Sequence, residues 1–197
     1  MPTTRMFDDD GFVGEKLAPF NPSSDEVIRT AIEMLQIRQD DVVYDLGCGD
    51  GRMLVEAVKA SGARGVGVEY HKKFSDRAHK RVAEAGLESK IDIVHGNVLG
   101  VEAADATVAF VYLVPAGIAA VKQTLVSLLK RGGRVATYVF SLPGLNPVRV
   151  QTFKATKLYL YAASSLEPDQ QTGVLGTSAL YEIQHGHGHG HGRRDKS

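Results

Sequence analysis

The stretch from residue 42 to residue 52 constrains the fold of this chain more than any other. It opens with the β-branched and aromatic run Val42-Val43-Tyr44, and Asp45 leads into a turn with glycine at positions 47, 49 and 51. Apolar residues at helical spacing follow from Arg52. Glycine permits positive φ values and lets a ligand approach main-chain N–H groups. The pattern therefore predicts a strand, a tight turn and a helix that together bind a small polar ligand.

Strand-like and helix-like segments alternate along the chain on both sides of this turn. Ser23 and Glu26 have the spacing of a capping box, which predicts the start of the first helix. This alternation indicates a parallel sheet with helices on both faces. The expected strands are 42–46, 65–69, 91–94, 106–114 and 134–140, and the expected helices run to about 36, over 52–60 and 72–85, and from 115 to about 131. The strand at 106–114 is apolar on both faces, so we expect it at the centre of the sheet.

The alternation ends after Pro143. Two strand-like stretches, 157–162 and 174–183, have no helix between them, so we expect an antiparallel hairpin at one edge of the sheet. Residues 185–197 begin with histidine and glycine in alternation, a composition typical of a disordered tail. Glycine between the histidines pre-organises no ligand set, and we predict no metal site.

Composition limits the class of protein. The 197 residues suit one domain, which we place at 19–184, with an irregular arm at 1–18. Lys and Arg balance Asp and Glu at 23 each, so no whole-chain charge attracts nucleic acid or a membrane. The first twenty residues resemble neither a signal peptide nor an Arg-rich transit peptide, and a lone cysteine mildly favours a reducing compartment. We therefore expect a cytoplasmic protein.

Two classes of cofactor bind at a glycine turn after the first strand. The dinucleotide pattern G-x-G-x-x-G would need a third glycine where this chain has Arg52, which disfavours a nicotinamide or flavin cofactor. The form D-x-G-x-G-x-G resembles motif I of the class I methyltransferases, which use S-adenosylmethionine (SAM). That resemblance implies a three-layer, Rossmann-like α/β fold with a seven-stranded sheet in the order 3-2-1-4-5-7-6, ending in an antiparallel hairpin.

The resemblance also implies roles for individual residues in binding SAM. The turn would hold the methionine end, and the acid that closes the second strand would bind the ribose hydroxyls, since its two oxygens can accept from two adjacent O–H donors. The residues after the second and third strands would contact adenine. The implied set is Asp45, Gly47, Cys48, Gly49, Asp50, Gly51, Glu69, Tyr70, Asn97 and Val98.

Four of these residues also have an ordinary structural explanation. Glu69 could be a solvated strand end, and Tyr70 a surface aromatic. Asn97 stands where the family usually has Asp and could be a turn residue. Cys48 could be a small side chain packed in the turn, which we favour over a catalytic thiol.

A closer resemblance concerns the methyl acceptor. The segments Pro19-Phe20-Asn21-Pro22-Ser23, Gly67-Val68-Glu69, Tyr112-Leu113-x-Pro115 and Phe140-Ser141-Leu142-Pro143-Gly144, together with the glycine turn, look like the small protein-lysine methyltransferases. The nearest group modifies the ATP synthase c-subunit and the adenine nucleotide translocase, and it has prokaryotic relatives. The resemblance implies a protein substrate with a target lysine, and it makes a mitochondrial location the alternative to a cytoplasmic one.

Lysine must lose a proton before it attacks a methyl group, and an apolar, aromatic channel lowers its pKa by desolvation. Tyr112, Phe20 and Phe140 are the candidates to line such a channel, although each could be plain core. The chain lacks N-P-P-Y or D-P-P-Y after the fourth strand, which argues against methylation of DNA adenine or glutamine. A small-molecule or RNA methyltransferase, or a non-catalytic SAM-binding partner subunit, remain alternatives. We expect no stable nucleic acid partner.

Overall fold

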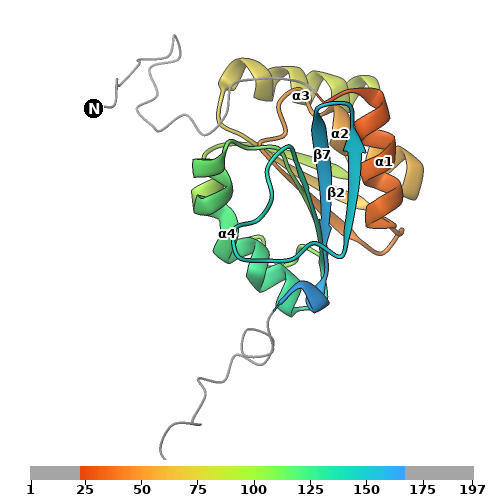
Figure 1. The fold of residues 1–197 in the computed structure, drawn as a ribbon. Coiled ribbons are helices and arrows are strands. Elements are labelled where there is room, and N and C mark those ends of the chain that lie inside the picture. The colour runs from red at the N-terminus through yellow and green to blue at the C-terminus, as the bar shows by residue number, and fades with distance from the viewer. Residues whose placement is uncertain (1–22, 167–197) are drawn as a thin grey trace, which may run out of the picture.

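The computed structural model describes residues 23–166 as one seven-stranded sheet with helices on both faces (Figure 1). The strand order is β3-β2-β1-β4-β5-β7-β6, with β1 to β5 parallel and β7 antiparallel to both β5 and β6. This order confirms the predicted fold class. The strands are β1 (Val42–Leu46), β2 (Arg64–Glu69), β3 (Ile91–His95), β4 (Val108–Val111), β5 (Arg134–Tyr138), β6 (Arg149–Phe153) and β7 (Thr156–Tyr161).

The sheet separates two hydrophobic cores, each covered by helices. Helices α1 (Asp25–Leu35), α2 (Arg52–Ser61) and α3 (Lys72–Glu84) cover one face of the sheet, and α4 (Pro115–Lys130) lies on the other face (Figure 1). We call the two sets of packed side chains the α1-side core and the α4-side core. All four residues of β4 are buried between them, which confirms the prediction that this strand is central. Two short 3-10 helices, η1 (Val98–Gly100) and η2 (Ala163–Ser165), complete the fold.

The start of the first helix corrects one prediction. The residue that caps α1 is Ser24, not Ser23, and its hydroxyl accepts a hydrogen bond from the N–H of Val27 at 3.4 Å. The capping-box spacing was therefore assigned one residue too early. The two serines are adjacent, and only the position of the first helical turn distinguishes them. The apolar stripe of α1 is buried as predicted.

The strands of the hairpin were also assigned wrongly. The hairpin pairs β6 with β7, so 157–162 is the second of its strands and not the first. The segment that became β6 is an edge strand whose five residues are exposed or only partly buried. It lacks the apolar run that marked the other strands. The stretch 174–183 lies outside the described residues, as do the arm at 1–18 and the tail.

Residues 23–166 contain no helix that is both long enough and apolar enough to cross a membrane.

Close packing where α4 turns into β5 gives a first testable prediction. A Cβ placed on Gly133 would overlap the buried side chain of Leu128 and lie 2.9 Å from the backbone oxygen of Leu128. Because a backbone atom cannot move aside cheaply, Gly133→Ala is expected to destabilise the fold by about 1–3 kcal/mol in urea unfolding. Gly100→Ala is the control, since nothing lies within 4 Å of its added methyl group. Equal stability of the two variants would contradict this packing.

Candidate active site

The glycine turn lies at the carboxyl end of β1, between β2 and β4. The N–H groups of Gly47 and Cys48 both donate to the carbonyl oxygen of Val68, at 2.9 and 3.0 Å. Gly47 has φ +90°, and a Cβ there would lie 2.9 Å from a methyl carbon of Leu113. Gly51 has φ +75° and precedes α2 without a side-chain cap. The turn thus needs glycine both for its backbone angles and for close packing against the exit of β4.

Glu69 ties the glycine turn to the end of β2. One carboxylate oxygen accepts from the N–H of Gly49 at 2.8 Å, and the other accepts from the N–H of His71, also at 2.8 Å. The residue is only 7% exposed. Each oxygen has a second lone pair, so the carboxylate can still accept hydrogen bonds from a ligand. The structure therefore favours a built polar site here over a solvated strand end.

Asp45 is a buried acid with no cation or hydrogen-bond donor among the described residues to stabilise its charged form. Its side chain is 3% exposed, and no residue between 23 and 166 donates a hydrogen bond to it. Burial first, and then the neighbouring charges of Glu69 and Asp50, raise the pKa of Asp45 to about 8. A cation bound nearby would stabilise its charged form.

Asp50 is engaged by two arginines. Its carboxylate accepts from Arg52 at 2.8 Å and from Arg81 of α3 at 2.9 Å, and Arg81 also donates to its backbone oxygen at 2.9 Å. Burial opposes ionisation, but these guanidinium groups outweigh it and hold the pKa of Asp50 below its usual range. Asp50 therefore joins the turn to α3. Its implied place at the methionine end of SAM stays a prediction.

Cys48 is a packed side chain. Its sulfur lies against Gly67 of β2, where an added Cβ would come within 2.8 Å of the sulfur. Burial first, and then the charge of Asp45, raise the pKa of the thiol well above its ordinary value. A protonated, buried thiol is a poor nucleophile, which supports packing over catalysis.

The residues predicted to contact adenine follow β2 and β3. The side-chain oxygen of Asn97 accepts from the N–H of Leu99 at 3.0 Å and caps η1, as a turn residue does. Val98 is buried in the α4-side core. Tyr70 is half-buried and meets the ring of His71 edge-on at 5.3 Å. The adenine roles of Asn97, Val98 and Tyr70 stay predictions.

The aromatic residues proposed for the acceptor channel do not form one wall. Tyr112 packs on the α1 side, Phe140 packs against the α4-side core, and Phe20 lies outside the described residues. Tyr112 instead meets Tyr138 at a ring-centroid distance of 4.8 Å, and Tyr138 meets Phe153 at 6.4 Å. We call Tyr112, Tyr138 and Phe153 the aromatic wall.

Sequence reasoning missed two members of this wall. Tyr138 ends β5, which pairs with β4, so its place near the end of the expected strand 134–140 was an available signal. Phe153 lies on the unassigned edge strand and gave no such signal.

The chemistry of the turn fits SAM. SAM carries two cationic groups, a sulfonium and an ammonium. The turn has an acid beside it in Asp45, whose carboxyl group has no hydrogen-bond donor or cation among residues 23–166. Its ribose offers two hydroxyl donors, and Glu69 has spare acceptor capacity. SAM supplies a methyl group that is activated on sulfur.

Known proteins agree with this chemistry. A family model described as the ANTKMT methyltransferase domain matches residues 45–149. A protein-lysine N-methyltransferase of Saccharolobus islandicus is 35% identical over 133 residues, which cover 67% of this chain and 83% of that protein.

Solved structures are similar too. An RNA methyltransferase from Salinibacter ruber in complex with S-adenosyl-L-homocysteine has a TM-score of 0.68 and 29% identity, and the match covers 72% of this chain and 92% of that one. A SAM-dependent methyltransferase from Geobacter sulfurreducens in complex with the same product has a TM-score of 0.54 and 25% identity, covering 68% and 53% of the two chains. The chain belongs to the ANTKMT methyltransferase family and is a SAM-dependent methyltransferase.

Proposed function

We propose that this enzyme transfers the methyl group of SAM to the ε-amino group of lysine in a protein substrate. The observation that carries the proposal is the 35% identity to a protein-lysine N-methyltransferase across 83% of that protein's length. The aromatic wall supports it. The wall offers an apolar surface near the carboxyl ends of the strands, where ligands bind in folds of this kind.

The proposal gives each part of the site a task. The glycine turn and Asp45 hold the cationic end of SAM, and Glu69 binds its ribose. Gly49, Gly51 and Cys48 shape the turn. Tyr70, Asn97 and Val98 flank the adenine ring.

The acceptor side has two tasks. The aromatic wall, with Phe20 and Phe140 as further candidates, excludes water and lowers the pKa of the incoming lysine by desolvation, so that the ammonium releases a proton. The neutral nitrogen then attacks the methyl carbon in line. An N–C bond forms as the S–C bond breaks, and the products are methyl-lysine and S-adenosylhomocysteine. Placement and exclusion of water supply most of the acceleration.

RNA is the second candidate acceptor. The structure from Salinibacter ruber is titled an RNA methyltransferase, and this chain covers 92% of it at 29% identity. The neutral net charge of the chain gives no general attraction to RNA. We therefore rank protein lysine first.

Labelled SAM separates the candidates. The purified enzyme is incubated with methyl-labelled SAM and cell extract, and the product is treated with protease or with nuclease. Label that protease releases supports protein methylation, whereas label that nuclease releases would make RNA the acceptor. No transfer to any fraction, with SAM binding confirmed by calorimetry, would favour a non-catalytic SAM-binding subunit.

Glu69 gives a second test of the cofactor site. Glu69→Ala is expected to weaken SAM binding by about 1–3 kcal/mol, because the ribose hydroxyls and two backbone N–H groups lose their acceptor. Glu69→Gln keeps the shape and one acceptor oxygen, so it is expected to weaken binding less. Calorimetry measures affinity, and thermal unfolding shows whether each variant is folded. Folded Glu69→Ala with wild-type affinity would show that β2 does not bind the ribose.

We further propose that the methyltransferase domain spans 19–184 and that the protein acts in the cytoplasm. The family match at 45–149 lies inside these bounds. Limited proteolysis with mass spectrometry tests the bounds, and cell fractionation tests the location.

A further inference from the structure

Val139, directly after β5, has a backbone conformation that valine rarely adopts. Its φ is +70°, in the left-handed region. A β-branched side chain there is a genuine outlier, since its Cβ crowds the neighbouring backbone. Such a conformation costs on the order of 1–3 kcal/mol and persists only where the surroundings impose it.

The surroundings of Val139 do impose it. Its N–H donates to the carbonyl oxygen of Lys157 on β7 at 2.8 Å. The fully buried hydroxyl of Thr137 donates to the carbonyl oxygen of Phe140 at 2.7 Å. The hydroxyl of Tyr161, also fully buried, accepts from the N–H of Leu142 at 2.8 Å. These three hydrogen bonds fix the backbone after β5 on both sides of Val139.

The strain decides where two aromatic rings point. In a continuous strand, residues two apart lie on the same face of the sheet. Here Tyr138 packs on the α1 side, whereas Phe140 packs against the α4-side core. The left-handed residue between them reverses the alternation, and only Tyr138 joins Tyr112.

The position of Tyr138 is fixed in other ways as well. Its hydroxyl forms a 2.9 Å hydrogen bond with the hydroxyl of Thr156, where the β6–β7 hairpin turns. Its ring lies against that of Tyr112 at an interplanar angle of 68°. Tyr138 therefore stands where β4, β5 and the hairpin meet.

This place adjoins the glycine turn. Leu46 of β1 pairs with Val111 of β4, and Val111 pairs with Thr137 of β5, so the three strands end in line. Leu113, one residue beyond Tyr112, packs against Gly47. The aromatic wall thus lies directly beside the strand ends that hold the glycine turn.

We propose that Val139 is a positioning residue for methyl transfer: its left-handed backbone holds Tyr138 in the aromatic wall that receives the acceptor lysine. The inference rests on the proposed function. It assigns the strain at Val139 to placement of the acceptor and not to binding of SAM or to stability.

Val139→Pro tests the inference, because the proline ring fixes φ at about −65° and so forbids the left-handed conformation. The variant also lacks the N–H that donates to Lys157, so it is expected to unfold at a lower temperature but to bind SAM with unchanged affinity. Its kcat for protein methylation is expected to fall about 10-fold, as expected when a positioning contact is loosened. The KM for SAM is expected to stay the same.

Two further variants keep the test sharp. Gln36→Pro is the matched control, since Gln36 at the end of α1 also has a positive φ, +47°, and an N–H that donates to a backbone oxygen, that of Glu33. Its kcat should not change. Thr137→Val removes the hydroxyl that holds the Phe140 carbonyl but keeps the shape, and should lower kcat in the same way. It tests the inference even if Val139→Pro fails to fold.

The outcomes separate this inference from the proposed function. A wild-type enzyme that labels no protein overturns both. A wild-type enzyme that labels protein, together with Val139→Pro or Thr137→Val at the wild-type rate, overturns the inference alone. An equal loss of kcat in Gln36→Pro would also overturn it, because the loss would not depend on the position of Tyr138.

Discussion

SAM binding is expected to strengthen by up to about 10-fold per pH unit as the pH rises from about 6 to about 8. Without ligand, Asp45 keeps its proton up to a pKa of about 8, because burial and the charges of Glu69 and Asp50 oppose ionisation. A bound cation favours the carboxylate, so below pH 8 binding must release that proton. Calorimetry over this pH range measures the effect.

Asp45→Asn is the matched variant. It keeps the shape of the side chain but cannot ionise, so SAM should bind more weakly at pH 8 and with a flat pH profile. The same pH slope in this variant and in the wild type would show that Asp45 does not face the cofactor.

The same shift predicts how the ligand-free fold depends on pH. The pKa of Asp45 is raised in the folded state, so the fold still holds a proton that the unfolded chain has released. Stability should therefore fall as the pH rises from about 4 to about 8, and the contribution is favourable only below that window. Asp45→Asn should remove this part of the pH dependence in thermal unfolding and should be more stable than the wild type at pH 8.

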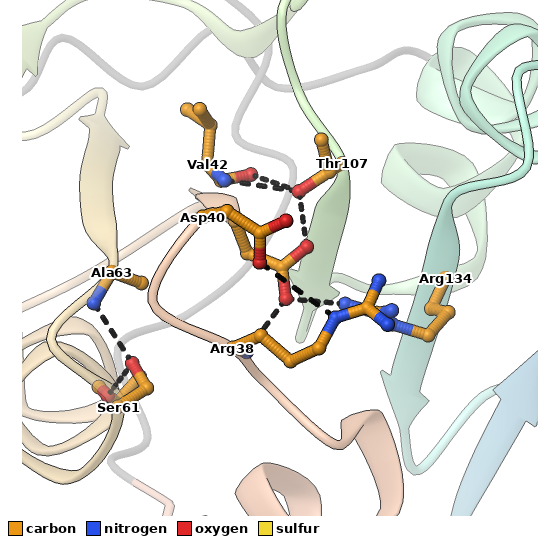
Figure 2. Close-up of polar contacts among 9 residues, drawn as sticks. Arg38, Asp40, Val42, Ser61, Ala63, Thr107 and Arg134 are labelled. Carbon is orange, nitrogen blue, oxygen red and sulfur yellow. Dashed lines mark hydrogen bonds and ion pairs between the residues drawn. The ribbon is translucent and has the colours of Figure 1, made fainter.

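Asp41→Ala is expected to lower the free energy of unfolding by about 3–5 kcal/mol. Asp41 is 4% exposed and accepts hydrogen bonds from the Arg38 N–H and the Thr107 hydroxyl, both at 2.7 Å, and from Arg134 at 2.5 Å. Val42, Thr107 and Arg134, labelled in Figure 2, lie where β1, β4 and β5 begin. Removing the carboxylate leaves the charge of Arg134 without its ion-pair partner. Urea unfolding at neutral pH measures the loss.

Asp40→Ala is the control for this prediction. Asp40 is the next residue along the chain, its side chain is 84% exposed, and it lies 3.8 Å from Arg38 (Figure 2). An exposed pair of this kind is worth about 0–1 kcal/mol. SAM affinity should not change in either variant. The cluster of Asp41 with Arg38, Thr107 and Arg134 lies at the amino ends of the strands, whereas the glycine turn lies at the carboxyl end of β1. Equal stability of Asp40→Ala and Asp41→Ala would contradict the role of the cluster.

Acid should weaken the Asp41 cluster. Burial opposes ionisation of Asp41, but the Arg38 N–H, the Thr107 hydroxyl and Arg134 outweigh it and hold the pKa of Asp41 below its ordinary value. The cluster therefore stabilises the fold above the unfolded pKa, and this contribution is lost as the pH falls through the lower, folded one.

The fold could be predicted because local patterns and topology agree. The glycine turn, the alternation of strands and helices, and the apolar β4 all point to one parallel sheet, and the structure has it. The hairpin was misassigned because β6 is an edge strand with little apolar surface. Its pairing with β7 depends on the neighbouring strand and not on its own sequence.

The site was harder to predict because several of its contacts join distant parts of the chain. Asp50 meets Arg81, 31 residues away, and no local pattern relates them. Tyr138 and Phe140 lie two residues apart in the expected strand 134–140, but the positive φ of Val139 lies between them and they pack in different cores. Valine disfavours that conformation, so a sequence pattern predicts the opposite. Asp45, Glu69 and the glycines stand in motif I and at a strand end, where local sequence suffices.

The most direct test of the central claim is the chemical identity of the methylated product. Protein labelled by the enzyme with methyl-labelled SAM is hydrolysed to amino acids, which are then separated. We predict that the label co-elutes with N-methylated lysine and that Glu69→Ala lowers its amount. Label on any other amino acid, or on nucleotides alone, would contradict the account.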